Sequence, residues 1–379
     1  MPRNPASLPP ASLPLAGWAD RQLCDLARLI GRTTPWPDTG ERLLGLRARL
    51  NGFRVPGAVS AGGGCRLLPT RDGWIALNLA RPDDRAMLPA LIGDANLAVD
   101  DETALRHAVR SMDWRELLDQ GRLLGLAMAG LDETPASPAV ARPVTGTARH
   151  GERPFRDRAP VVVDLSALWA GPLAGHLLGL GGARVVKVES PSRPDSLRSG
   201  DPALFAALNR AKEQTAIDLR AAEGRAALIE LVRHADVVIE AARPRALLQL
   251  GIDADALVRT VPGLVWVTIT GHGITGEAGN WVGFGDDAGV AGGLSAALYR
   301  ETGRIGFVGD AIADPLTGIM AAREAAQQLG EGTGARIVLS MSGVAARALA
   351  DSRTEDSAGL AADLRDWAAR HGQPIVPAG

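Results

Sequence analysis

The stretch VVVDLSALWAGPLAGHLLGLGGARVVKVESP, residues 161–191, decides the fold class. A run rich in valine leads into a tight turn and a helical stretch. A second valine-rich run then ends in Lys187 and Glu189. This order and length predict a βαβ unit, in which two parallel strands are joined by a helix.

The start of this helix is a candidate anion site. Gly171 and Pro172 stand where the first strand gives way to the helix, and Pro is tolerated in a first turn whose N–H has no partner. A phosphate or nucleotide binds favourably at such a helix start. The spacing from Gly171 to Gly175 is G-x-x-x-G and not the G-x-G-x-x-G of dinucleotide-binding proteins, so a dehydrogenase is disfavoured. Taken alone, the stretch also fits a plain α/β packing unit.

Length and composition indicate a large globular enzyme. The chain has 379 residues, 46% of them hydrophobic, and a formal net charge of −2, which argues against disorder and against nucleic-acid binding. Its two cysteines, Cys24 and Cys65, stand apart from any histidine cluster, so we expect no metal site. The sequence has neither a secretory leader pattern nor an apolar run of membrane-spanning length. We therefore expect a cytoplasmic protein without a membrane partner.

Changes in composition along the chain predict five regions. We expect a flexible Pro/Ser/Ala-rich tail at 1–16, and a helical connector with a small α/β domain at 17–134. A Pro/Arg-rich linker at 135–158 leads to a Rossmann-like domain at 159–345 and a C-terminal helical segment at 346–379.

The small domain should contain a hairpin followed by a helix. Residues 64–93, GCRLLPTRDGWIALNLARPDDRAMLPALIG, place the turn signal Arg71-Asp72-Gly73 between two apolar runs. Asp83 and Asp84 are suited to begin the helix that follows.

The Rossmann-like domain should contain a largely parallel sheet covered by helices. Apolar runs predict strands near 160–165, 184–188, 236–239, 264–269 and 336–340. In open α/β sheets, ligands bind at the carboxyl ends of the strands, so we expect the functional site at that edge.

Five motif blocks follow one another through this region, and together they suggest a family. They are DLSALWAGP at 164–172, VVKVESP at 185–191, NRAKEQTAID at 209–218, ADVVIE at 235–240, and ADPLTG at 313–318. In this order and at these intervals the chain resembles the class III CoA-transferases, or CaiB/BaiF family, which include formyl-CoA transferase and α-methylacyl-CoA racemase. The resemblance covers about residues 160–345.

The small domain also resembles part of this family. Residues 70–77, TRDGWIAL, match a block of the form T-x-D-G-W-[IL]-A-[LV], and residues 114–133 and 143–155 are similar to later family segments. In the family this block follows the nucleotide-binding half, whereas here it precedes it. The resemblance therefore implies a rearranged order of segments or a fragment of a tandem fusion.

The resemblance implies acyl-CoA transfer by a carboxylate nucleophile. In the family an aspartate attacks an acyl-CoA thioester to form a mixed anhydride, and CoA thiolate then returns to form an enzyme thioester. Asp314 matches this aspartate. A carboxylate at a helix start is also favoured as an N-cap, so a purely structural role is the alternative, and Asp310 is a rival nucleophile.

CoA, in free or acylated form, is the substrate that the resemblance implies, with a carboxylic acid as the second. Its phosphates call for lysine and arginine near helix starts. The residues expected to bind it are Lys212, Arg198, Arg243, Gly171, Pro172 and Trp169.

Several positions depart from the family pattern. Ala241 and Ala242 replace an asparagine and an aromatic residue, and Trp169 places an indole near the expected thioester end. The family's G-[YH]-D block reads Gly283-Phe284-Gly285, with its acidic residues displaced to Asp286 and Asp287. These departures imply an unusual acyl group or decayed catalysis.

Two other functions therefore stay open. A racemase of the family pairs a histidine with the aspartate, but Phe284 occupies that position, which leaves His176 and His272 as candidates. A catalytically lapsed CoA-binding or partner subunit is the other alternative. By resemblance we expect a homodimer, possibly with interlocked chains.

Overall fold

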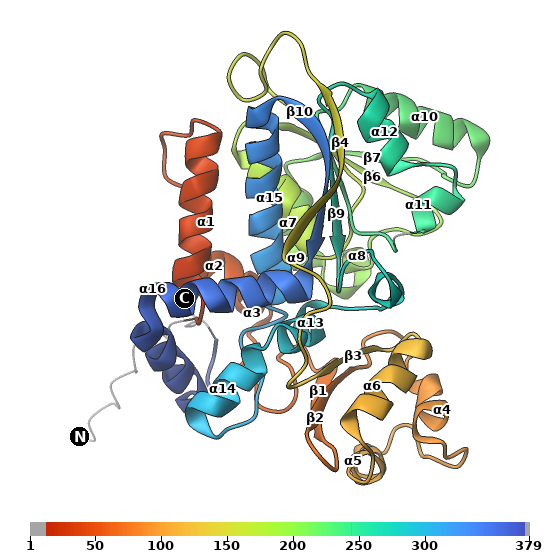
Figure 1. Ribbon diagram of the computed structural model, residues 1–379, viewed down its shortest axis with the longest axis vertical. Helices are drawn as coiled ribbons and strands as arrows, with labels where there is room; N and C mark the ends of the chain where they lie inside the picture. The colour runs from red at the N-terminus through yellow and green to blue at the C-terminus, as the bar shows by residue number, and fades with distance from the viewer. Residues whose placement is uncertain (1–12, 244, 376–379) are drawn as a thin grey trace.

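The computed structural model describes residues 13–243 and 245–375, and it forms two β-sheets (Figure 1). The larger sheet has seven strands in the order β4-β10-β9-β8-β5-β6-β7, and the smaller has the order β1-β2-β3. Helices cover both faces of the larger sheet. The α/β fold class predicted from the sequence is confirmed.

The larger sheet contains all five predicted strands. Its members are β4 (Val140–Ala148), β5 (Val161–Asp164), β6 (Arg184–Glu189), β7 (Glu213–Ala216), β8 (Val237–Glu240), β9 (Val265–Thr270) and β10 (Thr333–Ser340). All neighbouring strands are parallel except β4, which runs antiparallel to β10. The sheet is therefore largely parallel, as expected.

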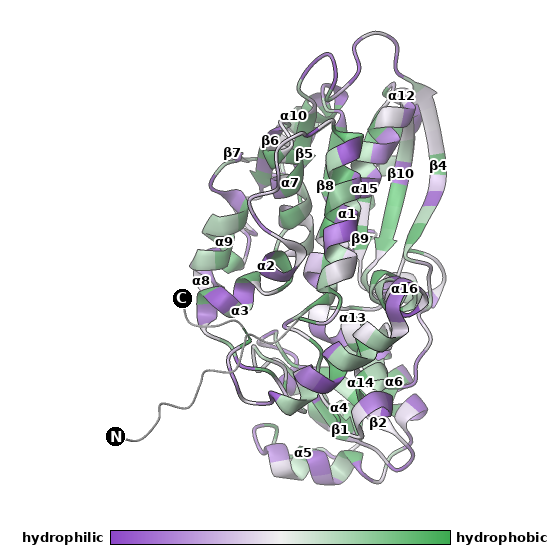
Figure 2. Ribbon diagram, turned by 90° about the vertical axis from the view of Figure 1, so that its left-hand side faces the viewer, coloured by the Kyte–Doolittle hydropathy of each residue, from purple (hydrophilic) through white to green (hydrophobic). Residues whose placement is uncertain are grey.

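Two edge strands were not predicted. The stretch 135–158, expected as a linker, contains β4, which covers the free edge of β10. In β4 only Val144 is buried, and Figure 2 shows the strand much paler than β8 or β10. All four residues of β7 are exposed. Because edge strands bury little apolar surface, their composition carried no strand signal.

The strand order creates a reversal point in the sheet. From β5 the chain adds β6 and β7 on one side, and then β8, β9 and β10 on the other. The carboxyl ends of β5 and β8 are thus the expected ligand position of a doubly wound sheet.

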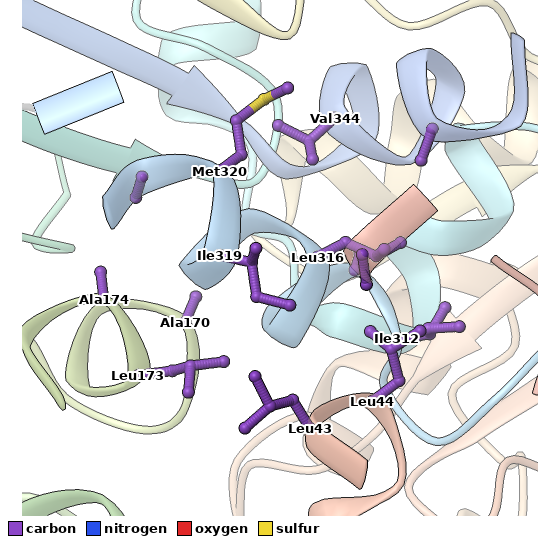
Figure 3. Packing of buried hydrophobic residues seen from close by; sticks show 14 of the residues in the cluster. Leu43, Leu44, Ala170, Leu173, Ala174, Ile312, Leu316, Ile319, Met320 and Val344 are labelled. Carbon is purple, nitrogen blue, oxygen red and sulfur yellow. The ribbon is translucent and has the colours of Figure 1, made fainter. Parts of the chain in front are cut away.

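Three helices pack together on one face of the sheet. They are α1 (Ala16–Leu29), α7 (Ala170–Leu180) and α15 (Ala313–Glu331), while α10 (Ala222–Arg233) and α12 (Ala254–Thr260) cover the opposite face (Figure 1). Figure 3 shows α7 and α15 packed through Leu173, Leu316 and Ile319, with Leu43 of the short helix at 40–44 beside them. A β-carbon at Gly318 would lie 2.6 Å from Ala170 O, so the absence of a side chain allows α15 to approach α7 closely.

The small domain forms around the predicted hairpin. Strands β1 (Cys65–Pro69) and β2 (Trp74–Asn78) are antiparallel, β3 (Ala127–Gly130) joins β2, and a 3₁₀ turn, η1 (Arg85–Met87), leads into α4 (Leu88–Ile92). Helices α5 (Glu102–Val109) and α6 (Trp114–Leu123) complete the core.

The remaining helices connect these parts. They are α2 (Gly40–Leu44), α3 (Leu46–Asn51), α8 (Leu197–Gly200), α9 (Pro202–Asn209), α11 (Ala246–Gln249), η2 (Glu277–Asn280), α13 (Gly285–Ala291), α14 (Leu294–Thr302) and α16 (Met341–Ala369). The N-terminal tail lies mostly outside the described residues, but Leu13 and Leu15 are buried, so packing begins before residue 16. The five-region division of the chain stays a prediction. None of the described helices is long and apolar enough to cross a membrane.

Candidate active site

Lys212, the lysine of the third motif block, lies inside the protein. Its ammonium group donates to Asp164 Oδ2 at 2.7 Å, to Pro172 O at 2.8 Å and to Asn209 Oδ1 at 2.9 Å. An ammonium has three N–H donors, so all three are used within the chain. The motif block at 209–218 is thereby joined to the block at 164–172, which contains Asp164 and the first turn of α7.

A second buried lysine links the neighbouring blocks. Lys187, at 0% exposure, donates to Ser166 O at 2.8 Å and lies 3.3 Å from Asp195 Oδ2. Burial favours the neutral form of Asp164, but Lys212 and Lys187 outweigh it and lower the pKa of that carboxyl. We call these residues, Asp164, Ser166, Lys187, Asp195, Asn209 and Lys212, the motif network.

Arg198 and Arg243 occupy more accessible positions. The guanidinium of Arg198 bonds Glu189 Oε1 and Gln214 Oε1, both at 2.7 Å, and lies 4.2 Å above the ring of Phe205. Its side chain is 44% exposed, which leaves room for an anion. Arg243, which follows β8, is exposed.

Gly171 and Trp169 lie at the start of α7, on either side of Ala170, whose N–H faces Asp314. A β-carbon at Gly171 would collide with the side chain of Ser166, so only glycine fits there. Trp169 is buried, and its indole N–H has no hydrogen-bond partner among the described residues. The guanidinium of Arg47 lies 5.6 Å from its ring centre.

Asp314 lies in the first turn of α15 and faces the start of α7. Its carboxylate accepts the backbone N–H of Ala170, the first residue of α7. A β-carbon at Gly285 would collide with Asp314 Oδ2, so α13 also begins against this carboxylate. The N-cap of α15 is Ile312, so the interpretation of Asp314 as an N-cap residue is wrong.

Two further carboxylates and one arginine surround Asp314. We call Arg47, Asp286, Asp310 and Asp314 the acid cluster. Burial raises the pKa of Asp314 to about 7. The charges of Asp286 and Asp310 add to this rise, whereas Arg47 and the Ala170 N–H oppose it. Burial and Asp310 raise the pKa of Asp286 to about 6, against the opposing charge of Arg47. Raised pKa values of this kind, with a named charge partner, often mark functional carboxylates.

Arg47 was missed by the sequence analysis. It comes from α3 and donates through Nε to Asp310 Oδ2 at 2.9 Å and through Nη2 to Oδ1. The two residues are 263 positions apart, and nothing in LRARLN marks one arginine as functional. The rival nucleophile Asp310 has an exposure of 0% and is held by this ion pair.

Strained backbone occurs on both sides of Asp314. Four non-glycine residues of the described chain have positive φ: Leu15, Phe155, Leu168 and Ala311. Leu168, with φ 64°, comes just before α7, and Ala311, with φ 43°, comes just before α15. Such conformations cost about 1–3 kcal/mol each and tend to collect at functional sites.

The remaining acidic and histidine candidates have other surroundings. Asp287 accepts the N–H of Phe284 and the amide of Asn78 at 2.9 Å, which joins α13 to the small sheet. His272 is buried without a partner for either ring nitrogen in the described part of the chain, and burial lowers its pKa to about 3. Burial and Lys212 lower the pKa of His176 to about 4. Both histidines are therefore neutral at pH 7.

The sequence model of CoA-transferase family III matches residues 160–371, more than half of the chain. The chain belongs to this family. The predicted resemblance is thereby confirmed for the Rossmann-like region, while the segment order and the likeness of the small domain stay predictions. Within residues 13–243 and 245–375, no three His, Cys, Asp or Glu side chains gather as a metal site would require.

Individual CoA-transferases show the same similarity. Succinyl-CoA–D-citramalate CoA-transferase of Chloroflexus aurantiacus is 35% identical over 195 residues, which are 48% of this chain and 48% of that protein. Succinate–glutarate CoA-transferase of Agrobacterium fabrum is 34% identical over 171 residues, 42% of this chain and 43% of that protein. The crystal structure of a CAIB/BAIF family protein from Brucella suis is 32% identical, with a TM-score of 0.48, and covers 53% of this chain and 57% of that one. The chain thus spans about half the length of the curated relatives it matches.

Proposed function

We propose that this family III protein transfers CoA between an acyl-CoA and a carboxylic acid, with Asp314 as the nucleophile. The observation that carries the proposal is the position of its carboxylate. It lies in the first turn of α15, bonded to the Ala170 N–H, within the acid cluster. The named relatives transfer CoA between dicarboxylic acids, which supports the reaction class.

The reaction proceeds through two kinds of acyl intermediate on Asp314. A carboxylate oxygen attacks the thioester carbonyl, the C–S bond breaks, and CoA thiolate leaves behind a mixed anhydride. The thiolate then attacks the aspartyl carbonyl, which releases the donor acid and forms an enzyme thioester. The acceptor carboxylate attacks this thioester, the C–S bond breaks, and CoA thiolate leaves behind a second anhydride. The thiolate then attacks the acceptor's acyl carbonyl, which forms the new acyl-CoA and frees the carboxylate of Asp314.

The acid cluster tunes Asp314 for this chemistry. A carboxylate with a pKa of about 7 is more basic than an ordinary aspartate and is about half ionised at neutral pH. Arg47 favours the ionised form, while Asp286 and Asp310 disfavour it. Each time Asp314 becomes acylated it loses its charge, which relieves the repulsion among the three carboxylates.

The proposal assigns CoA to the carboxyl edge of the sheet. Arg198 and Arg243 are accessible cations for its phosphates, and Trp169, Gly171 and Pro172 shape the start of α7. Since the donors of Lys212 are used internally, we propose that it acts by holding Pro172 in place. A cytoplasmic homodimer is also part of the proposal, and a mass near 39.5 kDa by light scattering would contradict the dimer.

The test is to trap the acyl intermediate on Asp314. The wild-type protein, incubated with acyl-CoA and no acceptor, should carry an adduct on the peptide of residues 309–323 that hydroxylamine or borohydride captures. Asp314→Asn should abolish this adduct and reduce turnover by at least about 10³-fold, because an amide cannot form the anhydride. Mass spectrometry of that peptide is the measurement.

Asp310→Asn is the matched control within the same peptide. It should turn over more slowly but keep the adduct on Asp314. An adduct that persists in Asp314→Asn, or full activity in that variant, would refute Asp314 as the nucleophile. Exchange of the α-proton in D₂O without any acceptor acid would instead support the isomerase alternative. Phe284 occupies the position of the racemase histidine and lacks a titratable group, which argues against the isomerase alternative.

A further inference from the structure

We infer that Asp286 is a positioning residue that, together with the Arg47–Asp310 ion pair, clamps the strained turn from which Asp314 projects. The inference rests on the proposed function for its effect on turnover. The clamp itself concerns the backbone conformation of the turn before α15, so it can be tested separately from turnover.

The turn before α15 has a backbone that its sequence does not favour. Gly309 has φ 72° and Ala311 has φ 43°. Glycine adopts such angles freely, whereas the β-carbon of alanine makes them unfavourable. The Ala311 carbonyl accepts the N–H of Asp314 at 2.9 Å, so the conformation of Ala311 directly sets where Asp314 begins.

Asp286 provides the first arm of the clamp. Its Oδ1 accepts the N–H of Ala311 at 2.9 Å, across 25 positions of sequence. Asp286 is held in turn by the hydroxyl of Ser60, which is itself buried and accepts the N–H of Cys65 at 3.0 Å. The strained residue is thereby tied to α13 and to the segment that precedes the small domain.

The Arg47–Asp310 pair provides the second arm. Asp310 comes directly before Ala311, and two donors of the Arg47 guanidinium hold its carboxylate. A planar guanidinium that bonds a carboxylate through two nitrogens fixes direction as well as distance. Two successive residues of the turn are therefore held by two different helices, neither of which is α15.

Asp286 is one of the acidic residues displaced from the family's G-[YH]-D block. The family aspartate of the G-[YH]-D block is replaced here by Gly285, whose missing β-carbon makes room for Asp314 Oδ2. The next position then brings a carboxylate to the Ala311 N–H.

The charge of Asp286 acts on Asp314 as well. The charged groups that face Asp314 are Arg47 from α3, Asp310 from the turn and Asp286 from α13, with the Ala170 N–H from α7. Removing the charge of Asp286 should lower the pKa of Asp314. The acid limb of the activity profile should then move to lower pH.

The experiment compares Asp286→Ala with Asp286→Asn in the full chain. Asp286→Ala removes the acceptor, so amide exchange in residues 309–314 should become about tenfold faster or more. Turnover should fall about 10-fold to 100-fold, with KM for acyl-CoA within about twofold, because the nucleophile is misplaced but the CoA contacts are intact. Asp286→Asn keeps an oxygen for the Ala311 N–H and should retain most of the protection and turnover. Both variants should shift the acid limb to lower pH.

Asp287→Asn is the matched control. Asp287 is the neighbouring buried carboxylate, but its partners are Phe284 and Asn78. Its replacement should lower the melting temperature without changing exchange in residues 309–314. Unchanged exchange in Asp286→Ala, or equally fast exchange in Asp287→Asn, would overturn the clamp even if Asp314 forms its adduct. If no adduct forms in the wild type, the proposed function fails while the exchange data still decide the clamp.

Discussion

The chain contains two clusters of charged residues, one buried and one partly exposed, and their charge balance differs. In the motif network, two aspartates face two lysines, Lys187 and Lys212. In the acid cluster, three aspartates face the single cation Arg47. Burial favours neutral carboxyls in both places, yet the pKa of Asp164 is lowered while that of Asp314 rises to about 7. The motif network, with two cations for two carboxylates, is therefore suited to a structural role. The acid cluster, with one cation for three carboxylates, is suited to chemistry.

Breaking the motif network should produce the largest effect on stability. Lys212→Met leaves the buried carboxylate of Asp164 without its partner and should cost about 3–5 kcal/mol in the free energy of unfolding. Urea denaturation measures this loss. The double variant Asp164→Asn, Lys212→Met removes both charges and should be less destabilised than Lys212→Met alone. If Lys212→Met keeps its stability and only weakens CoA binding, the lysine serves the ligand directly.

Crowding the acid cluster should mainly affect catalysis. An added methyl at Gly285 meets Asp314 Oδ2 and Ala311 O, so Gly285→Ala should reduce kcat about 10-fold to 100-fold by displacing the nucleophile. Steady-state kinetics measures this change. Gly289→Ala in the same helix is the control, since its nearest neighbour would lie 3.6 Å away and kcat should stay nearly unchanged. Equal kcat values for the two variants would place the carboxylate elsewhere.

The two clusters should respond to pH with opposite signs. Because its pKa is raised, Asp314 makes the wild type lose stability as pH rises from about 4 to about 7, so Asp314→Asn should be more stable by about 1–2 kcal/mol at pH 8 and unchanged near pH 4. Asp164 has a lowered pKa and contributes stability above pH 4, so Asp164→Asn should be destabilised at pH 8 and less so in acid. Thermal unfolding at both pH values tests the contrast. The same sign in both variants would contradict it.

The interior strands could be predicted because a sequence pattern repeats along the chain. Valine-rich runs predicted β5, β6, β8, β9 and β10, since a parallel sheet buried on both faces requires continuous apolar strands. The hairpin followed from its turn residues. The edge strands β4 and β7 could not be predicted in this way, because pairing with a neighbour, and not burial, makes them strands.

The residues of the candidate site likewise divide into those that the sequence predicts and those that only the tertiary structure identifies. Asp314 was predicted from its motif, and Lys212, Asp164 and Asn209 belong to blocks that also stand out in sequence. What Lys212 bonds to was decided by the tertiary structure, which uses up its donors inside the chain. Arg47 carries no local signal, since its partner is 263 positions away.

The sequence by itself determined the family, the parallel sheet and the identity of the proposed nucleophile, because each is indicated by patterns within short stretches of the chain. Only the tertiary structure decided the environment of that nucleophile. It brings α3, α7 and α13 to one carboxylate, places a single arginine among three acids, and holds Ala311 in a conformation that alanine alone would avoid. The physical reason is that burial and Coulomb interactions depend on distance in space, which the order of residues along the chain does not contain.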